Sequence, residues 1–61
     1  MTEKIYYLEL TDDLCDAFWL IEMNFPCFTE YEDVEMNYVK ATICARTEDI
    51  SHIEDILAPY I

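Results

Sequence analysis

The residue types that most often carry out chemistry in proteins are scarce in this chain, acids excepted. Its 61 residues include one histidine, His52, and three cysteines, Cys15, Cys27 and Cys44. A cysteine with a histidine as its base can act as a nucleophile. No cysteine lies near His52 in the sequence, and free cysteines are usually buried as small apolar residues. We therefore expect three buried thiols and an exposed histidine.

Metal and phosphate sites are also disfavoured by the residues present. Structural zinc needs cysteines and histidines at short, regular spacing, which the chain lacks. A glycine-rich phosphate loop is impossible because the chain has no glycine. With 14 aspartates and glutamates, two neighbouring acids do not indicate an acid–base pair. We expect no catalytic, metal-binding or cofactor-binding residue and no enzymatic activity.

The densest acidic segment is EYEDVE, residues 30–35, in a chain with a formal net charge of −11. Such a charge steers a protein toward basic surfaces and excludes direct nucleic-acid binding, because phosphates are contacted by lysine and arginine. Acids at helix starts are explained by the helix dipole, whereas acids crowded into a hairpin repel one another. The predicted partner-binding residues are Glu30, Tyr31, Glu32, Asp33 and Glu35. The alternative is a solvated loop whose charge protects a sheet edge from aggregation.

The first half of the chain reads as a strand followed by a helix. Residues 3–10 are rich in aromatic and branched residues, which favours a strand. Thr11 is the expected N-cap of a helix of about three turns that stops before Pro26. The helix carries two apolar stripes, so we expect it to be covered on more than one side. The first stripe is Leu14, Ala17, Phe18 and Ile21, and the second is Cys15, Trp19 and Met23.

A hairpin is expected next, with strands over residues 27–32 and 36–45 joined through Asp33 and Val34. Without glycine, a positive φ angle must fall on an asparagine or aspartate. The candidates are Asn24, Asp33 and Asn37. Along the longer strand, small and branched residues alternate with polar ones, which predicts that a helix packs closely on one face.

A second helix follows, capped by Thr47 and ending near Pro59, with an apolar stripe at helical spacing. The resulting order is β-α-β-β-α in one small domain, residues 1–61. We therefore predict an α+β fold of two layers, in which a three-stranded, antiparallel-containing sheet carries two helices on one face. In layout it is similar to a ferredoxin-like unit without its last strand.

The sheet face opposite the helices is predicted to be apolar and therefore adhesive. Tyrosine and methionine are enriched where proteins meet, and a small domain gains stability from a partner subunit. We expect a homodimer, either face to face or through the open edge of the first strand. The predicted interface residues are Ile5, Tyr7, Met36, Tyr38 and Cys44.

Two classes of function compete on these observations. In the first, the protein is a small acidic inhibitor that docks on a basic surface of a larger, nucleic-acid-handling protein. In type it resembles phage-encoded inhibitors used in counter-defence or host takeover. In the second, it is a non-enzymatic structural or regulatory subunit that binds through the apolar sheet face. We expect a cytoplasmic protein, in a bacterial or host cell, without membrane contact. This expectation rests on the odd number of cysteines, a start unlike a signal peptide and the absence of a membrane-length apolar segment.

Overall fold

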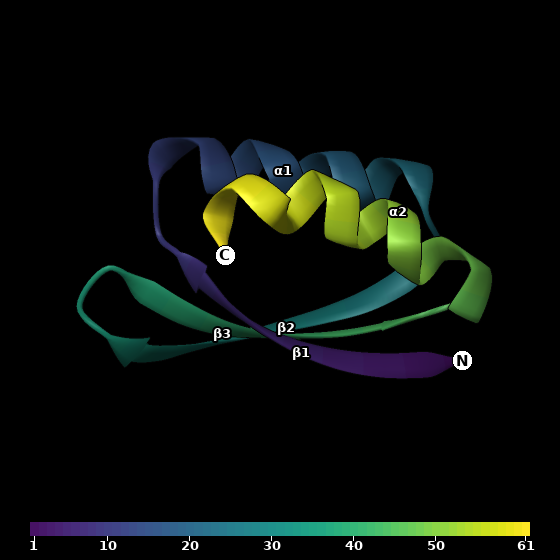
Figure 1. The fold of residues 1–61 in the computed structure, drawn as a ribbon, viewed down its shortest axis with the longest axis horizontal. Coiled ribbons are helices and arrows are strands. Elements are labelled where there is room, and N and C mark those ends of the chain that lie inside the picture. The colour runs from purple at the N-terminus through teal and green to yellow at the C-terminus, as the bar shows by residue number, and fades with distance from the viewer.

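Two helices lie on one face of a three-stranded sheet in a computed structural model that describes all 61 residues (Figure 1). The elements in chain order are β1 (Thr2–Glu9), α1 (Asp12–Asn24), β2 (Cys27–Glu35), β3 (Tyr38–Ala45), α2 (Thr47–Leu57) and the short 3₁₀ helix η1 (Ala58–Tyr60). The predicted α+β fold class and order of elements are confirmed.

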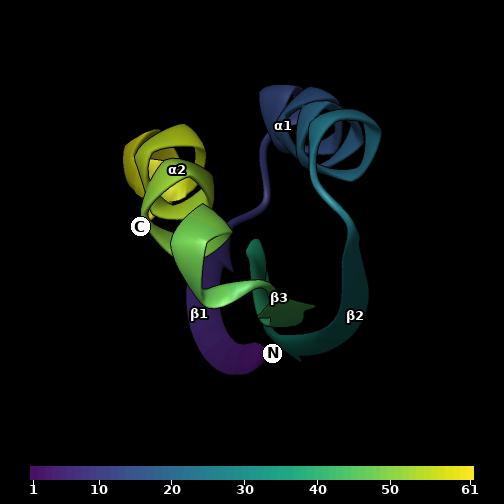
Figure 2. The same cartoon turned by 90° about the vertical axis from the view of Figure 1, so that its right-hand side faces the viewer.

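The sheet has the order β1-β3-β2, and both pairs of strands are antiparallel. Because β3 is central, β1 and β2 each have one edge that no other strand covers. In end view α1 lies above β2 and α2 lies above β1 (Figure 2). The two helices thus cover the sheet from one side only and leave its other face open.

The core lies between the two layers. From the sheet it takes alternating residues of β1 and β3, and from the helices it takes the first stripe of α1 and the inner face of α2. Ala41 and Ala45 are fully buried, which fits the predicted close approach of the helices. The twelve core residues are Tyr6, Leu8, Leu14, Phe18, Ile21, Val39, Ala41, Ile43, Ala45, Ile50, Ile53 and Leu57.

The turn between β2 and β3 lies farther along the chain than predicted. β2 continues to Glu35, and the turn falls at Met36 and Asn37. Asn37 has a φ of 69°, a left-handed conformation that asparagine tolerates better than most residues. The predicted turn at Asp33 and Val34 is wrong, because a register shift between Asp33 and Glu35 absorbs one extra residue and lets the strand continue.

The helix starts differ from the predictions in detail. Thr11 is the N-cap of α1, but its hydroxyl makes no capping hydrogen bond and its Oγ1 is buried without a partner. Arg46, and not Thr47, is the N-cap of α2. The Thr47 hydroxyl lies 2.6 Å from that of Thr2, and Arg46 Nε donates to the buried Asp49 carboxylate at 2.7 Å. The Thr47 hydroxyl therefore contacts β1 and does not cap α2.

The second stripe of α1 is exposed, which corrects the prediction that this helix is covered on more than one side. Trp19 is 63% exposed and Met23 is 65% exposed. No third layer lies outside α1, so only the stripe that faces the sheet is buried. The prediction of three buried thiols is also wrong, because Cys15 is exposed and Cys27 and Cys44 are half-buried. His52 is exposed, as predicted.

Candidate functional site

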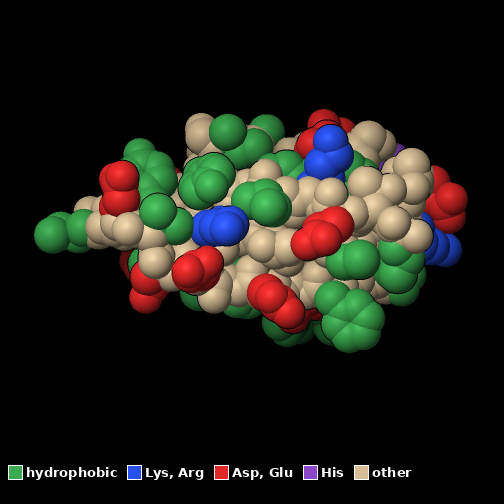
Figure 3. Space-filling view, turned by 90° about the horizontal axis from the view of Figure 1, so that it is seen from below, with side chains coloured by type: hydrophobic (Ala, Val, Ile, Leu, Met, Phe, Trp, Pro, Cys, Tyr) green, Lys and Arg blue, Asp and Glu red, His purple; other side chains and the backbone are tan.

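The open face of the sheet gathers acids and apolar side chains from all three strands. Side chains alternate between the two faces of a sheet, and the strand register therefore fixes which residues share this face. We define the open face by these residues: Glu3, Ile5, Tyr7 and Glu9 from β1, Tyr38, Lys40, Thr42 and Cys44 from β3, and Phe28, Glu30, Glu32 and Glu35 from β2. Viewed from below the sheet, acidic and hydrophobic side chains are interspersed across the surface (Figure 3).

The electrostatics of the open face are strongly negative. Its five glutamates face one cation, Lys40, which lies between Tyr7 and Glu32 in the register. Both ion pairs within 4.0 Å in the molecule belong to Arg46 at the start of α2, so Lys40 neutralises no carboxylate by direct contact. The face therefore combines unpaired negative charge with exposed apolar surface.

Four apolar or aromatic side chains on the open face are largely exposed. Ile5, Tyr7 and Tyr38 are 51%, 57% and 42% exposed, and Phe28 is 75% exposed. The register spreads these side chains along the length of the face, from Phe28 opposite Cys44 to Tyr38 opposite Glu35. Phe28 was not among the predicted interface residues, because the sequence of β2 lacks the alternation that would have told its two faces apart.

The predicted partner-binding cluster is divided between the two faces of β2. Glu30, Glu32 and Glu35 lie on the open face, whereas the side chains of Tyr31 and Asp33 lie on the helix side. The cause is the two-residue period of the strand, followed by the register shift that returns Glu35 to the open face. Only three of the five predicted residues can therefore contact one flat partner together.

The predicted dimer residues are brought together with one exception. Ile5, Tyr7, Tyr38 and Cys44 share the open face. Met36 lies in the turn instead, where it is 87% exposed, because β3 begins two residues later than predicted. Whether these residues pair two copies of the chain stays a prediction.

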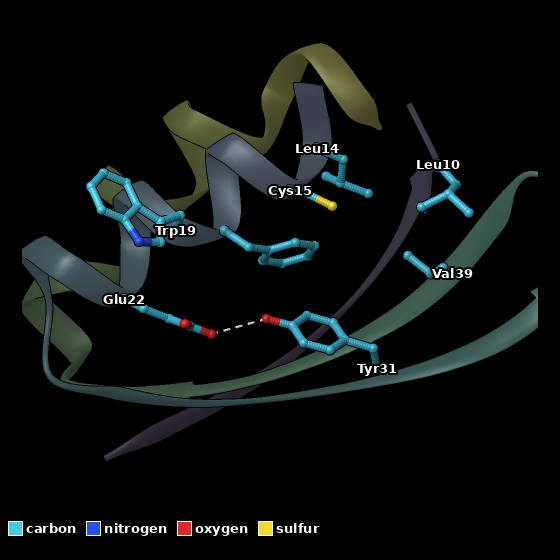
Figure 4. Close-up of a pocket in the computed structure, with 8 residues that line it drawn as sticks. Leu10, Leu14, Cys15, Trp19, Glu22, Tyr31 and Val39 are labelled. Carbon is cyan, nitrogen blue, oxygen red and sulfur yellow. Dashed lines mark hydrogen bonds between the residues drawn. The ribbon is translucent and has the colours of Figure 1, made fainter. Parts of the chain in front are cut away.

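A second surface feature is an apolar groove between α1 and the sheet, with a volume of about 420 Å³ (Figure 4). Its walls come from Leu10, just after β1, from both stripes of α1, and from β2 and β3. The Phe18 and Tyr31 rings meet edge to face, with centroids 4.6 Å apart. The lining residues are Leu10, Leu14, Cys15, Phe18, Trp19, Glu22, Tyr31 and Val39.

One charged residue, Glu22, lies in this groove, where it ties α1 to β2. The Thr29 hydroxyl donates to Glu22 Oε1 at 2.7 Å, and the Tyr31 hydroxyl donates to the same oxygen at 3.0 Å. Burial raises the pKa of Tyr31, and the hydrogen bond to Glu22 adds to the increase. The neutral hydroxyl of Tyr31 is therefore held on the helix side of the strand.

The groove was missed in the sequence because its residues come from separate elements. Its only signals were the second stripe of α1, which includes Cys15 and Trp19, and an aromatic residue in β2. Periodicity shows that a helix face is apolar, but it does not show whether another element covers that face.

The half-buried thiol of Cys27 lies near acidic side chains. Burial raises the pKa of the Cys27 thiol, and the charges of Glu22 and Asp49 add to the increase. Because the thiolate is the reactive form, this environment makes Cys27 a poor nucleophile. No group of three or more histidine, cysteine, aspartate or glutamate side chains is placed to hold a metal ion.

Neither α1 nor α2 has the length and hydropathy that a helix needs to cross a bilayer. Comparison with known proteins adds no further assignment. No protein-family model matches the chain, and neither a curated protein nor a solved structure matches it.

Proposed function

We propose that this protein is a small acidic inhibitor that docks its open face on a basic surface of a larger, nucleic-acid-handling protein. The observation that carries the proposal is the open face itself, where five glutamates and one lysine are interspersed with four exposed apolar or aromatic side chains. A reducing compartment such as the cytosol suits the three free cysteines.

The chemistry of the open face fits a surface that normally binds phosphate. Carboxylates can accept the same charge-assisted hydrogen bonds from arginine and lysine that phosphate oxygens accept. Exposed aromatic residues such as Tyr7 and Phe28 supply anchors, since aromatic side chains dominate the energetics of many interfaces. A partner that binds here would have its basic surface covered and so lose access to nucleic acid.

The alternative function, assembly through apolar contacts alone, is favoured by the exposure of Ile5, Tyr7, Phe28 and Tyr38. In this case the glutamates provide solubility, and the face binds a second copy or another subunit. Face-to-face pairing of two copies places glutamates opposite glutamates, which opposes the homodimer at low salt. Ionic strength therefore distinguishes the two functions, because exposed charges are screened beyond about 8 Å at physiological salt.

The test is affinity capture from a bacterial lysate, with double-stranded DNA as the competitor. We expect DNA to displace the captured protein, because both ligands use one basic surface. The variant Glu30→Lys/Glu32→Lys should lose the capture. The matched control Asp16→Lys/Asp55→Lys changes the net charge equally at exposed positions on the helices, and it should retain the capture.

Three outcomes would contradict the proposal. The first is equal capture by the two double variants, since the open face would then have no special role. The second is retention of the partner in the presence of excess DNA. The third is a complex that persists in high salt, which would favour apolar assembly instead.

A further inference from the structure

The edge of β2 that no other strand covers adjoins the groove under α1. We propose that a segment of the basic partner with alternating apolar and basic residues adds to β2 as a fourth, antiparallel strand. Its apolar side chains occupy the groove under α1, and its basic side chains lie on the open face beside the glutamates. This inference depends on the proposed function, because it specifies how part of the basic partner is bound.

The backbone of β2 has groups available for such a strand. The Asn37 carbonyl accepts a hydrogen bond of 2.6 Å from the Leu10 N–H, on the β1 side of β3. No peptide bond is cis, so the next N–H, that of Tyr38, points the opposite way, toward β2. By alternation the even-numbered residues of β3 direct their backbone groups to β2.

The partners of these β3 residues in the register are Phe28, Glu30 and Glu32. The residues between and beyond them, Thr29, Tyr31 and Asp33, therefore direct their N–H and C=O groups away from the sheet. These outward groups form a row with the spacing of a strand, and no element of the chain pairs with β2 on this side. An added strand would satisfy them, which is the basis of recognition by strand addition.

The groove lies on the same side as the side chains of these edge residues. Trp19 and Cys15 of α1 and Tyr31 of β2 line it (Figure 4). Its volume of about 420 Å³ falls within the range of about 300 to 1,000 Å³ that is usual for ligand clefts. An incoming residue opposite Tyr31 would point its side chain into this apolar space, because directly paired residues share a face.

The next residue of the incoming strand would point to the open face, between or beside Glu30 and Glu32. A lysine or arginine is the complementary side chain there, and opposite charges paired across strands are stabilising. The two faces of β2 thus select opposite chemistries at alternate positions. This alternation defines the ligand more narrowly than net charge does.

A second copy of the chain is a poor occupant of this edge. The sequence of β2, CFTEYEDVE, contains four acids and no base. Two β2 strands side by side would set these carboxylates against one another, and like charges directly opposite are destabilising. The edge is therefore protected from self-pairing by the same acids that favour a basic strand.

The test uses a short synthetic peptide of alternating valine and lysine, with binding measured by calorimetry. In the added strand, a valine opposite Tyr31 directs its side chain to the groove and its backbone N–H to the edge of β2. N-methylation of the valines therefore removes the N–H groups that would bond to β2. N-methylation of the lysines removes N–H groups that point away and is the matched control. We expect valine methylation to weaken binding at least about tenfold and lysine methylation to change it less than about twofold.

Variants of the protein test the groove independently. Trp19→Ala should weaken the unmodified peptide about tenfold, as is typical of an aromatic anchor. Met23→Ala is the control, because Met23 is equally exposed on α1 but does not line the groove. Equal effects of the two methylations, a larger effect of lysine methylation, or equal effects of the two alanine variants would overturn the inference.

Failure of this inference is distinguishable from failure of the proposed function. If the peptide does not bind while a captured protein is still displaced by DNA and lost in Glu30→Lys/Glu32→Lys, the open face acts without strand addition. If both experiments fail, the acidic face has no basic partner. Peptide binding that is lost in Glu30→Lys/Glu32→Lys and sensitive to valine methylation supports both the strand addition and the proposed function.

Discussion

At the scale of single residues, Tyr6 brings the only polar group into the twelve-residue core. Its hydroxyl donates to Glu54 Oε2 at 3.0 Å and so links β1 to α2. Burial, with the Glu54 hydrogen bond and charge, raises the pKa of Tyr6 from 10.0 to about 12. The neutral hydroxyl is thus part of the folded structure, and its loss should cost stability.

Because of Tyr6, we expect the free energy of unfolding to depend on pH in alkaline solution. The pKa is higher in the folded state, so the contribution of Tyr6 is complete below pH 10 and is lost as the pH rises to about 12. Tyr6→Phe should lower the free energy of unfolding near neutral pH by about 1 kcal/mol through the lost hydrogen bond. The variant should also flatten the fall between pH 10 and 12, as measured by urea unfolding.

Glu54→Gln is the matched control for this prediction. It removes the negative charge but leaves Tyr6 buried, and burial is the largest cause of the raised pKa. The alkaline fall in stability should therefore persist in Glu54→Gln. If Tyr6→Phe and the parent protein lose stability in parallel above pH 10, Tyr6 is not the responsible group.

Thr11 gives a second prediction at this scale, because its Oγ1 is buried with no hydrogen-bond partner. A buried unsatisfied hydroxyl is destabilising, and Thr11→Val removes it with little change of shape. We expect the free energy of unfolding to rise by up to about 1 kcal/mol. Thr47→Val is the contrasting variant, because it breaks the 2.6 Å contact with Thr2 and should destabilise. A loss of about 1 kcal/mol in Thr11→Val would instead be the cost of removing a working N-cap.

At the scale of elements, the sequence predicted the order of strands and helices because the strongest signals were local. Aromatic and branched residues along 3–10, alternation along 36–45 and the stripes of the two helices each fit one type of element. The turn was misplaced because aspartate is typical of turns, whereas exposed positions of an edge strand also accept acidic residues. Phe28 and Glu35 could be assigned to the open face only once the register and its shift were known.

Variants of Asn37 test the backbone conformation of the turn between β2 and β3. Its φ of 69° is costly for residues with a Cβ other than asparagine and aspartate. Asn37→Ala should therefore lower the free energy of unfolding by about 1 kcal/mol, whereas Asn37→Gly should stay close to the parent protein. Asn24→Ala is the control, since Asn24 was also a candidate for the left-handed conformation but does not adopt it. Equal losses in Asn37→Ala and Asn37→Gly would show that the side chain, and not the backbone conformation, is needed.

At the scale of the whole molecule, the monomer buries a normal share of its surface. Its accessible area is 4248 Å², close to the value of about 4,200 Å² that the scaling of folded monomers gives for 7.3 kDa. Seven of the thirteen exposed large apolar residues lie on the open face or line the groove, and both of these surfaces adjoin acids.

This arrangement predicts that self-association depends on salt. Repulsion between open faces should keep the chain monomeric at low ionic strength, and screening should allow association through Ile5, Tyr7, Phe28 and Tyr38 as salt is raised. Sedimentation equilibrium at increasing salt measures this directly. Tyr7→Glu, on the β1 part of the open face, should remain monomeric throughout, whereas Met23→Glu, on α1, should associate like the parent protein.

On the open face, binding of a basic partner and binding of a second copy should depend on salt in opposite directions. A basic partner binds most tightly at low salt because attraction between unlike charges is then least screened, whereas a second copy binds most tightly at high salt. A dimer that persists at low salt would mean that apolar contact outweighs the repulsion of the glutamates. The open face would then be occupied by the chain itself, and a basic partner would have to compete with the dimer for it.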